Sequence, residues 1–143
     1  MYNITFEQPS TILISGATNT GKTTICNKII KHKHVLFENP PKYVVYCYSH
    51  KQDEQHQMYQ KGLISKLLED FPGYEEIKAI LMPYKNIGSL LVLDDGLSNL
   101  NDDIARIFFE LSHHVNCTVI LTAQNLFYSN RHFRTLSLNT KVK

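Results

Sequence analysis

The stretch SGATNTGKTT, residues 15–24, decides how the rest of the chain is interpreted. Its spacing matches G-x-x-x-x-G-K-[ST], in which two glycines let the backbone turn tightly and direct N–H groups at a phosphate. Lys22 would reach the β- and γ-phosphates of a nucleoside triphosphate, and the Thr23 hydroxyl would ligate Mg²⁺. The residues expected to hold the nucleotide are Gly16, Ala17, Thr18, Asn19, Thr20, Gly21, Lys22, Thr23 and Thr24.

The segments on either side of this loop have the strand and helix patterns that its mechanism requires. TILIS at 11–15 is a short apolar run that predicts a buried strand, and 22–31 carries an apolar stripe at helical spacing. Further strands are predicted at 2–7, 43–48, 90–94 and 117–123, and further helices at 63–69, 74–82 and 102–114. The chain after 123 is predicted to be irregular.

Apolar strands that alternate with helices predict an α/β fold, a mostly parallel sheet with helices on both faces. We expect one domain over residues 1–143, arranged as the three-layer sandwich of P-loop NTPases. Ligands of such sheets bind at the carboxyl ends of the strands. The candidate functional residues all follow strands, so we expect them at that edge.

The strand at 90–94 ends in two carboxylates, Asp94 and Asp95. Asp94 is placed to hold Mg²⁺, directly or through water, and Asp95 could polarise the attacking water as a base. The alternative for Asp95 is a turn or helix cap before the next helix. An Asp base is one methylene shorter than the more usual Glu.

The strand at 117–123 is followed by Gln124 and Asn125, which could sense the γ-phosphate and orient water if this strand lies between the other two. The alternative is an ordinary start of a loop. Arg131 and Arg134 come next, and either could stabilise transition-state charge in a neighbouring subunit or simply pack on the surface.

Composition limits the classes of protein that fit. The net charge of +2 is too small to indicate nucleic acid by itself, and no apolar run approaches the length of a membrane span. The start of the chain lacks the pattern of a signal peptide, so we expect an intracellular protein that does not contact the membrane. Three widely spaced cysteines in apolar segments indicate buried free thiols rather than disulfides or a metal site.

Taken together, SGATNTGKTT, VVYCYS, LLVLDD, LSHHVNCTVILTAQNLF and HFRTLSLN resemble the viral genome-packaging ATPases of the FtsK–HerA superfamily. The nearest likeness is to the poxvirus-type group that includes the ATPases of Polinton/Maverick elements. The resemblance implies a homo-oligomeric ring that uses ATP and Mg²⁺ to move double-stranded DNA into a capsid, with capsid proteins as partners. It implies a location in the host cytoplasm or nucleus, or in the virion.

By the same resemblance, Lys22 and Thr23 bind ATP and Mg²⁺, Asp94 and Asp95 form the acidic motif, Gln124 is the sensor and Arg134 acts in trans. The family continues after SLN into an apolar strand that flanks the phosphate-loop strand, whereas this sequence ends at TKVK. We therefore expect the last strand to be missing and an exposed sheet edge, unless residues 2–7 cover it. Two alternatives stay open, a nucleotide-binding module without turnover and a small-molecule kinase. A GTPase is disfavoured because no N-K-x-D motif occurs.

Overall fold

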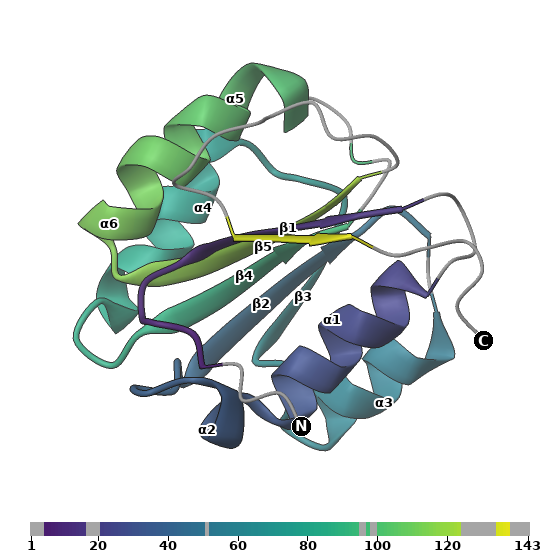
Figure 1. The fold of residues 1–143 in the computed structure, drawn as a ribbon. Coiled ribbons are helices and arrows are strands. Elements are labelled where there is room, and N and C mark those ends of the chain that lie inside the picture. The colour runs from purple at the N-terminus through teal and green to yellow at the C-terminus, as the bar shows by residue number, and fades with distance from the viewer. Residues whose placement is uncertain are drawn as a thin grey trace.

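The fold is an α/β arrangement in which one parallel sheet is covered by helices on both faces (Figure 1). The computed structural model describes residues 5–16, 21–50, 52–94, 97, 100–123 and 134–137. In that part of the chain no helix is both long and apolar enough to cross a membrane.

The described residues form a six-stranded sheet in the order β3-β2-β4-β5-β1-β6, and every pairing between these strands is parallel. The strands are β1 Thr11–Ser15, β2 Tyr43–Tyr48, β3 Lys66–Glu69, β4 Ser89–Leu93, β5 Cys117–Ala123 and β6 Arg134–Ser137. Because the strands are parallel, their carboxyl ends meet at one edge of the sheet, where the sequence analysis places the ligand.

The helices connect the strands and divide between the two faces of the sheet. They are α1 Lys22–Lys31, α2 Lys33–Leu36, α3 Asp53–Gln60, α4 Tyr74–Leu81, α5 Leu100–Arg106 and α6 Ser112–His114. A turn of 3-10 helix, Met82–Tyr84, follows α4, and a π-helical segment, Ile107–Leu111, joins α5 to α6. Figure 1 shows α1 and α3 on one face, and α4, α5 and α6 on the other.

Each strand contributes alternate side chains to two separate cores, as the period of two in a β-strand requires. On β4, Leu90 and Val92 pack beneath α1 and α3, whereas Leu91 and Leu93 pack against the helices of the opposite face. Both faces of β4 are therefore apolar, which explains why its sequence is a continuous hydrophobic run.

The structure confirms the predicted strands near 11–15, 43–48, 90–94 and 117–123 and the helices at 22–31, 74–82 and 102–114. The predicted helix at 63–69 is wrong, because this segment contains β3. Its neighbouring residues Leu67 and Leu68 pack into opposite cores, which is the geometry of a strand. Of the predicted strand at 2–7, residues 5–7 are described, and they contribute an isolated bridge from Phe6 to Phe37.

The prediction of an irregular tail is wrong for residues 134–137, and so is the expectation of an exposed edge at β1. Residues Arg134–Ser137 form β6, which pairs with β1 from Ile12 to Ser15. The phosphate-loop strand therefore lies between β5 and β6 rather than at an exposed edge. A strand of four residues with mixed polarity lacks the long apolar run by which buried strands are predicted. Its extended conformation depends on pairing with β1 rather than on its own sequence.

Candidate nucleotide-binding site

The strand register brings three predicted site segments to one place. Ser15 of β1 pairs with Ala123 of β5, and Leu93 of β4 pairs with Leu121 of β5. The ends of β1, β4 and β5 therefore come together at the carboxyl edge of the sheet. The strand order confirms that β5 lies between the phosphate-loop strand and the acidic strand.

The described ends of the phosphate loop have the geometry of a chain that turns sharply into a helix. The Gly16 N–H donates to the Ala123 carbonyl at 3.1 Å, which ties the start of the loop to the end of β5. Gly21 precedes α1 with φ at 93°, a left-handed conformation that favours glycine. Helix α1 has no acidic residue in its first turn, so its N-terminus is suited to an anion. Ala17, Thr18, Asn19 and Thr20 lie outside the described residues.

Lys22 and Asp94 are two buried charged residues at the carboxyl edge of the sheet. Their exposed fractions are 7% and 9%, so both charged side chains are largely removed from water. Burial raises the pKa of the Cys26 thiol, the negative charge of Asp94 raises it further, and the positive charge of Lys22 acts in the opposite direction. Lys22 at the start of α1 and Asp94 just after β4 therefore both lie near enough to Cys26 to influence its thiol.

Asp94 is held on both carboxylate oxygens. The Thr122 hydroxyl donates to Oδ1 at 3.0 Å, and the Tyr46 hydroxyl contacts Oδ2 at 3.4 Å. The Asp94 N–H donates to the Cys47 carbonyl at 3.2 Å, which continues the pairing of β4 with β2 by one residue. Side chains from β5 and β2 thus orient a carboxylate that follows β4.

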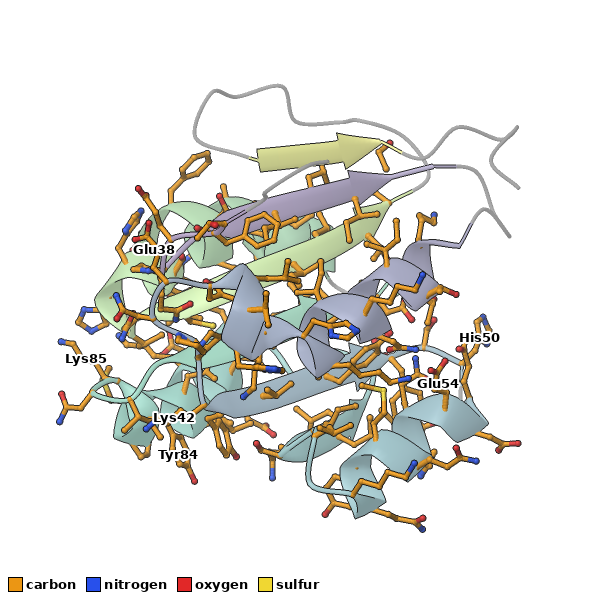
Figure 2. All side chains as sticks on the ribbon, turned by 60° about the horizontal axis from the view of Figure 1, so that its bottom comes forward. Glu38, Lys42, His50, Glu54, Tyr84 and Lys85 are labelled. Atoms are coloured by element: carbon orange, nitrogen blue, oxygen red, sulfur yellow. The ribbon has the colours of Figure 1, made fainter. Side chains whose placement is uncertain are left out.

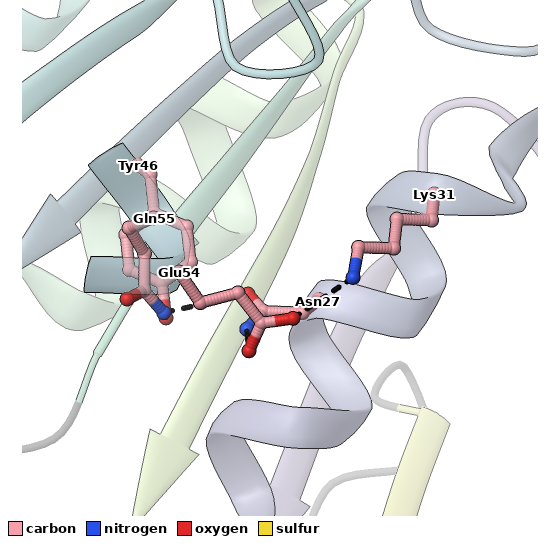
Figure 3. A network of polar contacts seen from close by, with 5 residues as sticks. All are labelled: Asn27, Lys31, Tyr46, Glu54 and Gln55. Carbon is pink, nitrogen blue, oxygen red and sulfur yellow. Dashed lines mark hydrogen bonds and ion pairs between the residues drawn. The ribbon is translucent and has the colours of Figure 1, made fainter. Parts of the chain in front are cut away.

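The contacts of Tyr46 extend into a polar network that crosses from β2 to α3 and α1 (Figure 3). Gln55 Nε2 contacts the Tyr46 hydroxyl at 3.2 Å and Asn27 Oδ1 at 3.4 Å. Asn27 Nδ2 donates to Glu54 at 2.9 Å, and Lys31 Nζ binds the same carboxylate at 2.8 Å. This network, Tyr46–Gln55–Asn27–Glu54–Lys31, runs from Asp94 to the protein surface.

The donor set at the edge fits a magnesium ion that is shared with a nucleotide. Mg²⁺ in such sites is bound through one or two carboxylates, with phosphates and water completing its shell. Asp94 supplies a carboxylate and Thr23, which is half-buried, supplies a hydroxyl. Within the ranges that the structure describes, no group of three histidine, cysteine, aspartate or glutamate residues could form a metal cage.

Several predicted residues are placed only in part or not at all. Thr24 is exposed on the first turn of α1. Asp95, Gln124, Asn125 and Arg131 lie outside the described part of the chain. The backbone of Arg134 begins β6 opposite Ile12, three residues before β1 ends, and so roughly 10 Å along the strand from the end of β1.

A cavity of about 430 Å³ lies at the opposite edge of the sheet, where the strands begin. Its lining includes Gln8, Lys42, Asn86 and Asn116, and Gln8 is fixed there by a hydrogen bond from Nε2 to the Asn116 carbonyl at 2.9 Å. Figure 2 shows Lys42, Tyr84 and Lys85 near this end, and His50 and Glu54 toward the other. The cavity is therefore separate from the residues around Asp94.

Thr122, Tyr46 and Gln55 were not predicted from the sequence. Thr122 carries a weak signal, since it is a hydroxyl residue near the carboxyl end of a mostly apolar run. Tyr46 and Gln55 carry none, because a strand tyrosine and a helix glutamine are ordinary residues. No protein-family model matches this chain, and no curated protein matches its sequence.

Proposed function

We propose that this chain is an ATP-binding and ATP-hydrolysing domain of the P-loop NTPase class. The observation that carries the proposal is the meeting of Lys22, the N-terminus of α1 and Asp94 at one edge of a parallel sheet. P-loop NTPases differ in whether one further strand separates the phosphate-loop strand from the strand that carries the acidic motif. The position of β5 between β1 and β4 supports the division that has this strand. The sequence G-x-x-x-x-G-K-T supports a triphosphate as the ligand.

In this proposal each residue has a distinct role. The loop amides and Lys22 bind the β- and γ-phosphates, and Thr23 and Asp94 hold Mg²⁺. The ion, when bound, offsets the negative charge that develops on the phosphates. Asp95 accepts a proton from the attacking water, and Gln124 orients that water. Hydrolysis then needs no covalent intermediate on the protein.

We further propose, on the resemblance to packaging ATPases, that hydrolysis moves double-stranded DNA through a ring of copies of this chain. Arg134 would then act on the nucleotide of the adjacent subunit. Two observations agree with action in trans: β6 is the edge strand of the described sheet, and the Arg134 backbone lies well back from the phosphate loop of its own subunit. A nucleotide-binding module without turnover stays the alternative proposal.

Binding of a fluorescent ATP analogue to wild type and to Lys22→Ala, followed by ATPase assays with and without double-stranded DNA, tests the proposal. Lys22→Ala should abolish binding, because it removes the positive charge of the phosphate cradle. Lys28→Ala is the matched control, since Lys28 is an exposed lysine on the same helix. Equal micromolar affinity of Lys22→Ala and wild type would overturn the proposal, and binding without turnover under any condition would leave a nucleotide-binding module.

A further inference from the structure

We propose that Tyr46 is a positioning residue for Asp94 and that Gln55 acts through it by orienting the Tyr46 hydroxyl. The inference rests on the proposed function, in which Asp94 helps to hold Mg²⁺ beside a nucleotide. Tyr46 lies in the middle of β2, on the strand next to β4, and its side chain is completely buried beneath α1 and α3. Its hydroxyl is therefore a polar group that must find partners inside the core.

The direction of the hydrogen bonds follows from counting donors. An amide nitrogen can only donate, so the Gln55 Nε2 contact at 3.2 Å makes the Tyr46 oxygen an acceptor there. The one hydroxyl hydrogen is then left for Asp94 Oδ2, the other polar neighbour, at 3.4 Å. The hydroxyl therefore donates to the carboxylate.

Gln55 is itself held in place by the surrounding network. It is 2% exposed, and its Nε2 also contacts Asn27 Oδ1 at 3.4 Å. Asn27 is fixed in turn by Glu54, whose other oxygen binds Lys31 (Figure 3). Helix α1, which begins at the phosphate loop, and helix α3 are therefore joined to the carboxylate through one tyrosine.

This arrangement gives Asp94 a fixed orientation relative to the phosphate loop. Thr122 holds Oδ1 and Tyr46 holds Oδ2, so rotation of the carboxylate would break a bond on either side. Groups that orient a metal-binding carboxylate in this way typically change metal affinity by about 10- to 100-fold when they are removed. The expected consequence is an effect on Mg²⁺ rather than on the nucleotide alone.

The test is a titration with MgCl₂ of a fluorescent ATP analogue bound to Tyr46→Phe and to wild type. Binding in EDTA should be equal within about twofold, whereas the MgCl₂ concentration for half-maximal enhancement should rise about tenfold in Tyr46→Phe. Tyr43→Phe is the matched control, because Tyr43 lies at the other end of β2 and stacks on Tyr84. It should leave the MgCl₂ dependence unchanged.

A double-mutant cycle tests whether Gln55 acts through Tyr46. Gln55→Met alone should raise the half-maximal MgCl₂ concentration less than Tyr46→Phe does, and the double variant should be no worse than Tyr46→Phe. If Tyr46→Phe does not fold, Gln55→Met still gives a measurable shift. A wild type that binds the analogue with the same MgCl₂ dependence as these variants would overturn this inference alone. A wild type that binds no analogue would overturn the proposed function as well.

Discussion

The hydroxyl of Thr122, at the end of β5, donates to the Asp94 carboxylate just beyond the end of β4, across a distance of 3.0 Å. Both side chains are buried, so the bond is shielded from competing water. It joins the acidic segment to the strand that leads into Gln124. A substitution that moves the end of β4 or of β5 should therefore also change the position of the other.

Thr122→Val should weaken Mg²⁺-dependent nucleotide binding while it preserves the shape of the core. The substitution removes a hydrogen bond to a charged group, which should lower the free energy of unfolding by about 2 kcal/mol. Urea unfolding measures the loss of stability, and titration of a fluorescent ATP analogue with MgCl₂ measures the change at the site.

Thr118→Val provides the control for this prediction. Thr118 is also buried on β5, but its hydroxyl interacts with Gln8 and with the Ser10 N–H at the other end of the strand. Thr118→Val should lower the free energy of unfolding without changing how nucleotide binding depends on MgCl₂. Identical MgCl₂ curves for the two variants would show that the Thr122 contact is structural only.

Gly21→Ala should weaken ATP binding through the backbone alone. A Cβ at Gly21 would meet nothing within 4 Å, so the cost arises from its φ of 93° and should be about 1 kcal/mol of stability. Gly62, with φ at 83° and equally open surroundings, is a matched control far from the site in sequence. Both variants should have a similarly lowered melting temperature, but only Gly21→Ala should have a weakened ATP affinity. Equal ATP affinity in both would show that the turn before α1 does not shape the site.

Much of the fold could be predicted from the sequence because the central strands are apolar on both faces. Residues 90–93, LLVL, form a continuous hydrophobic run, and residues 117–121, CTVIL, form a nearly continuous one; such runs are typical of buried parallel strands. The short strands β3 and β6 could not be predicted in the same way. Each has four residues and lies at an edge of the described sheet. There, tertiary contacts rather than a local sequence pattern decide the conformation.

The candidate site was predictable only where a residue type carries its own chemical signature. Lys22 and Asp94 stand at motif positions that require a cation and a carboxylate. Gln55 lies on α3, a helix that the sequence analysis did not predict, and its buried amide nitrogen contacts Tyr46 and Asn27. A buried glutamine of this kind depends on partners far apart in the chain, which no local pattern reveals.

The thiols of Cys26, Cys47 and Cys117 should resist thiol reagents in the native protein. All three are buried and free, and burial is the main cause that raises the pKa of Cys47 and of Cys117 to about 12. At pH 8 a colorimetric disulfide reagent should label none of them without urea and all three in urea, because the thiolate is the reactive form. Rapid labelling of any one in the native protein would contradict its burial.

The same shifts predict how stability depends on alkaline pH. A native thiol keeps its proton up to about pH 12, whereas an unfolded thiol releases it above its ordinary value near 9. The unfolded state therefore binds fewer protons above pH 9, and stability should fall as pH rises through that range. Each thiol should contribute about 1.4 kcal/mol per pH unit there. Urea unfolding of wild type and Cys117→Ala between pH 8 and 10 checks the slope, which should be smaller in the variant.

Arg134→Ala should lower ATP turnover only in the assembled protein. The position of Arg134 at the start of the edge strand β6, away from its own phosphate loop, fits a residue that serves a neighbouring subunit. Arginines that act in trans contribute about 10³- to 10⁵-fold in rate. Wild-type turnover per subunit should therefore rise steeply with protein concentration or on addition of double-stranded DNA. Arg134→Ala should bind ATP normally and stay at the low rate of the isolated subunit.

Mixing two inactive variants separates action in trans from a loss within one subunit. Asp95→Asn keeps the shape of the side chain but removes the proposed proton acceptor, so it should bind ATP and turn over slowly. In a mixture, an Arg134→Ala subunit retains Asp95, and an adjacent Asp95→Asn subunit can supply the arginine. Some shared interfaces would then hold both groups, and turnover should exceed the sum of the two variants measured alone. Turnover per subunit in the wild type that is independent of concentration and DNA would contradict the ring motor and leave a domain that hydrolyses ATP as a monomer.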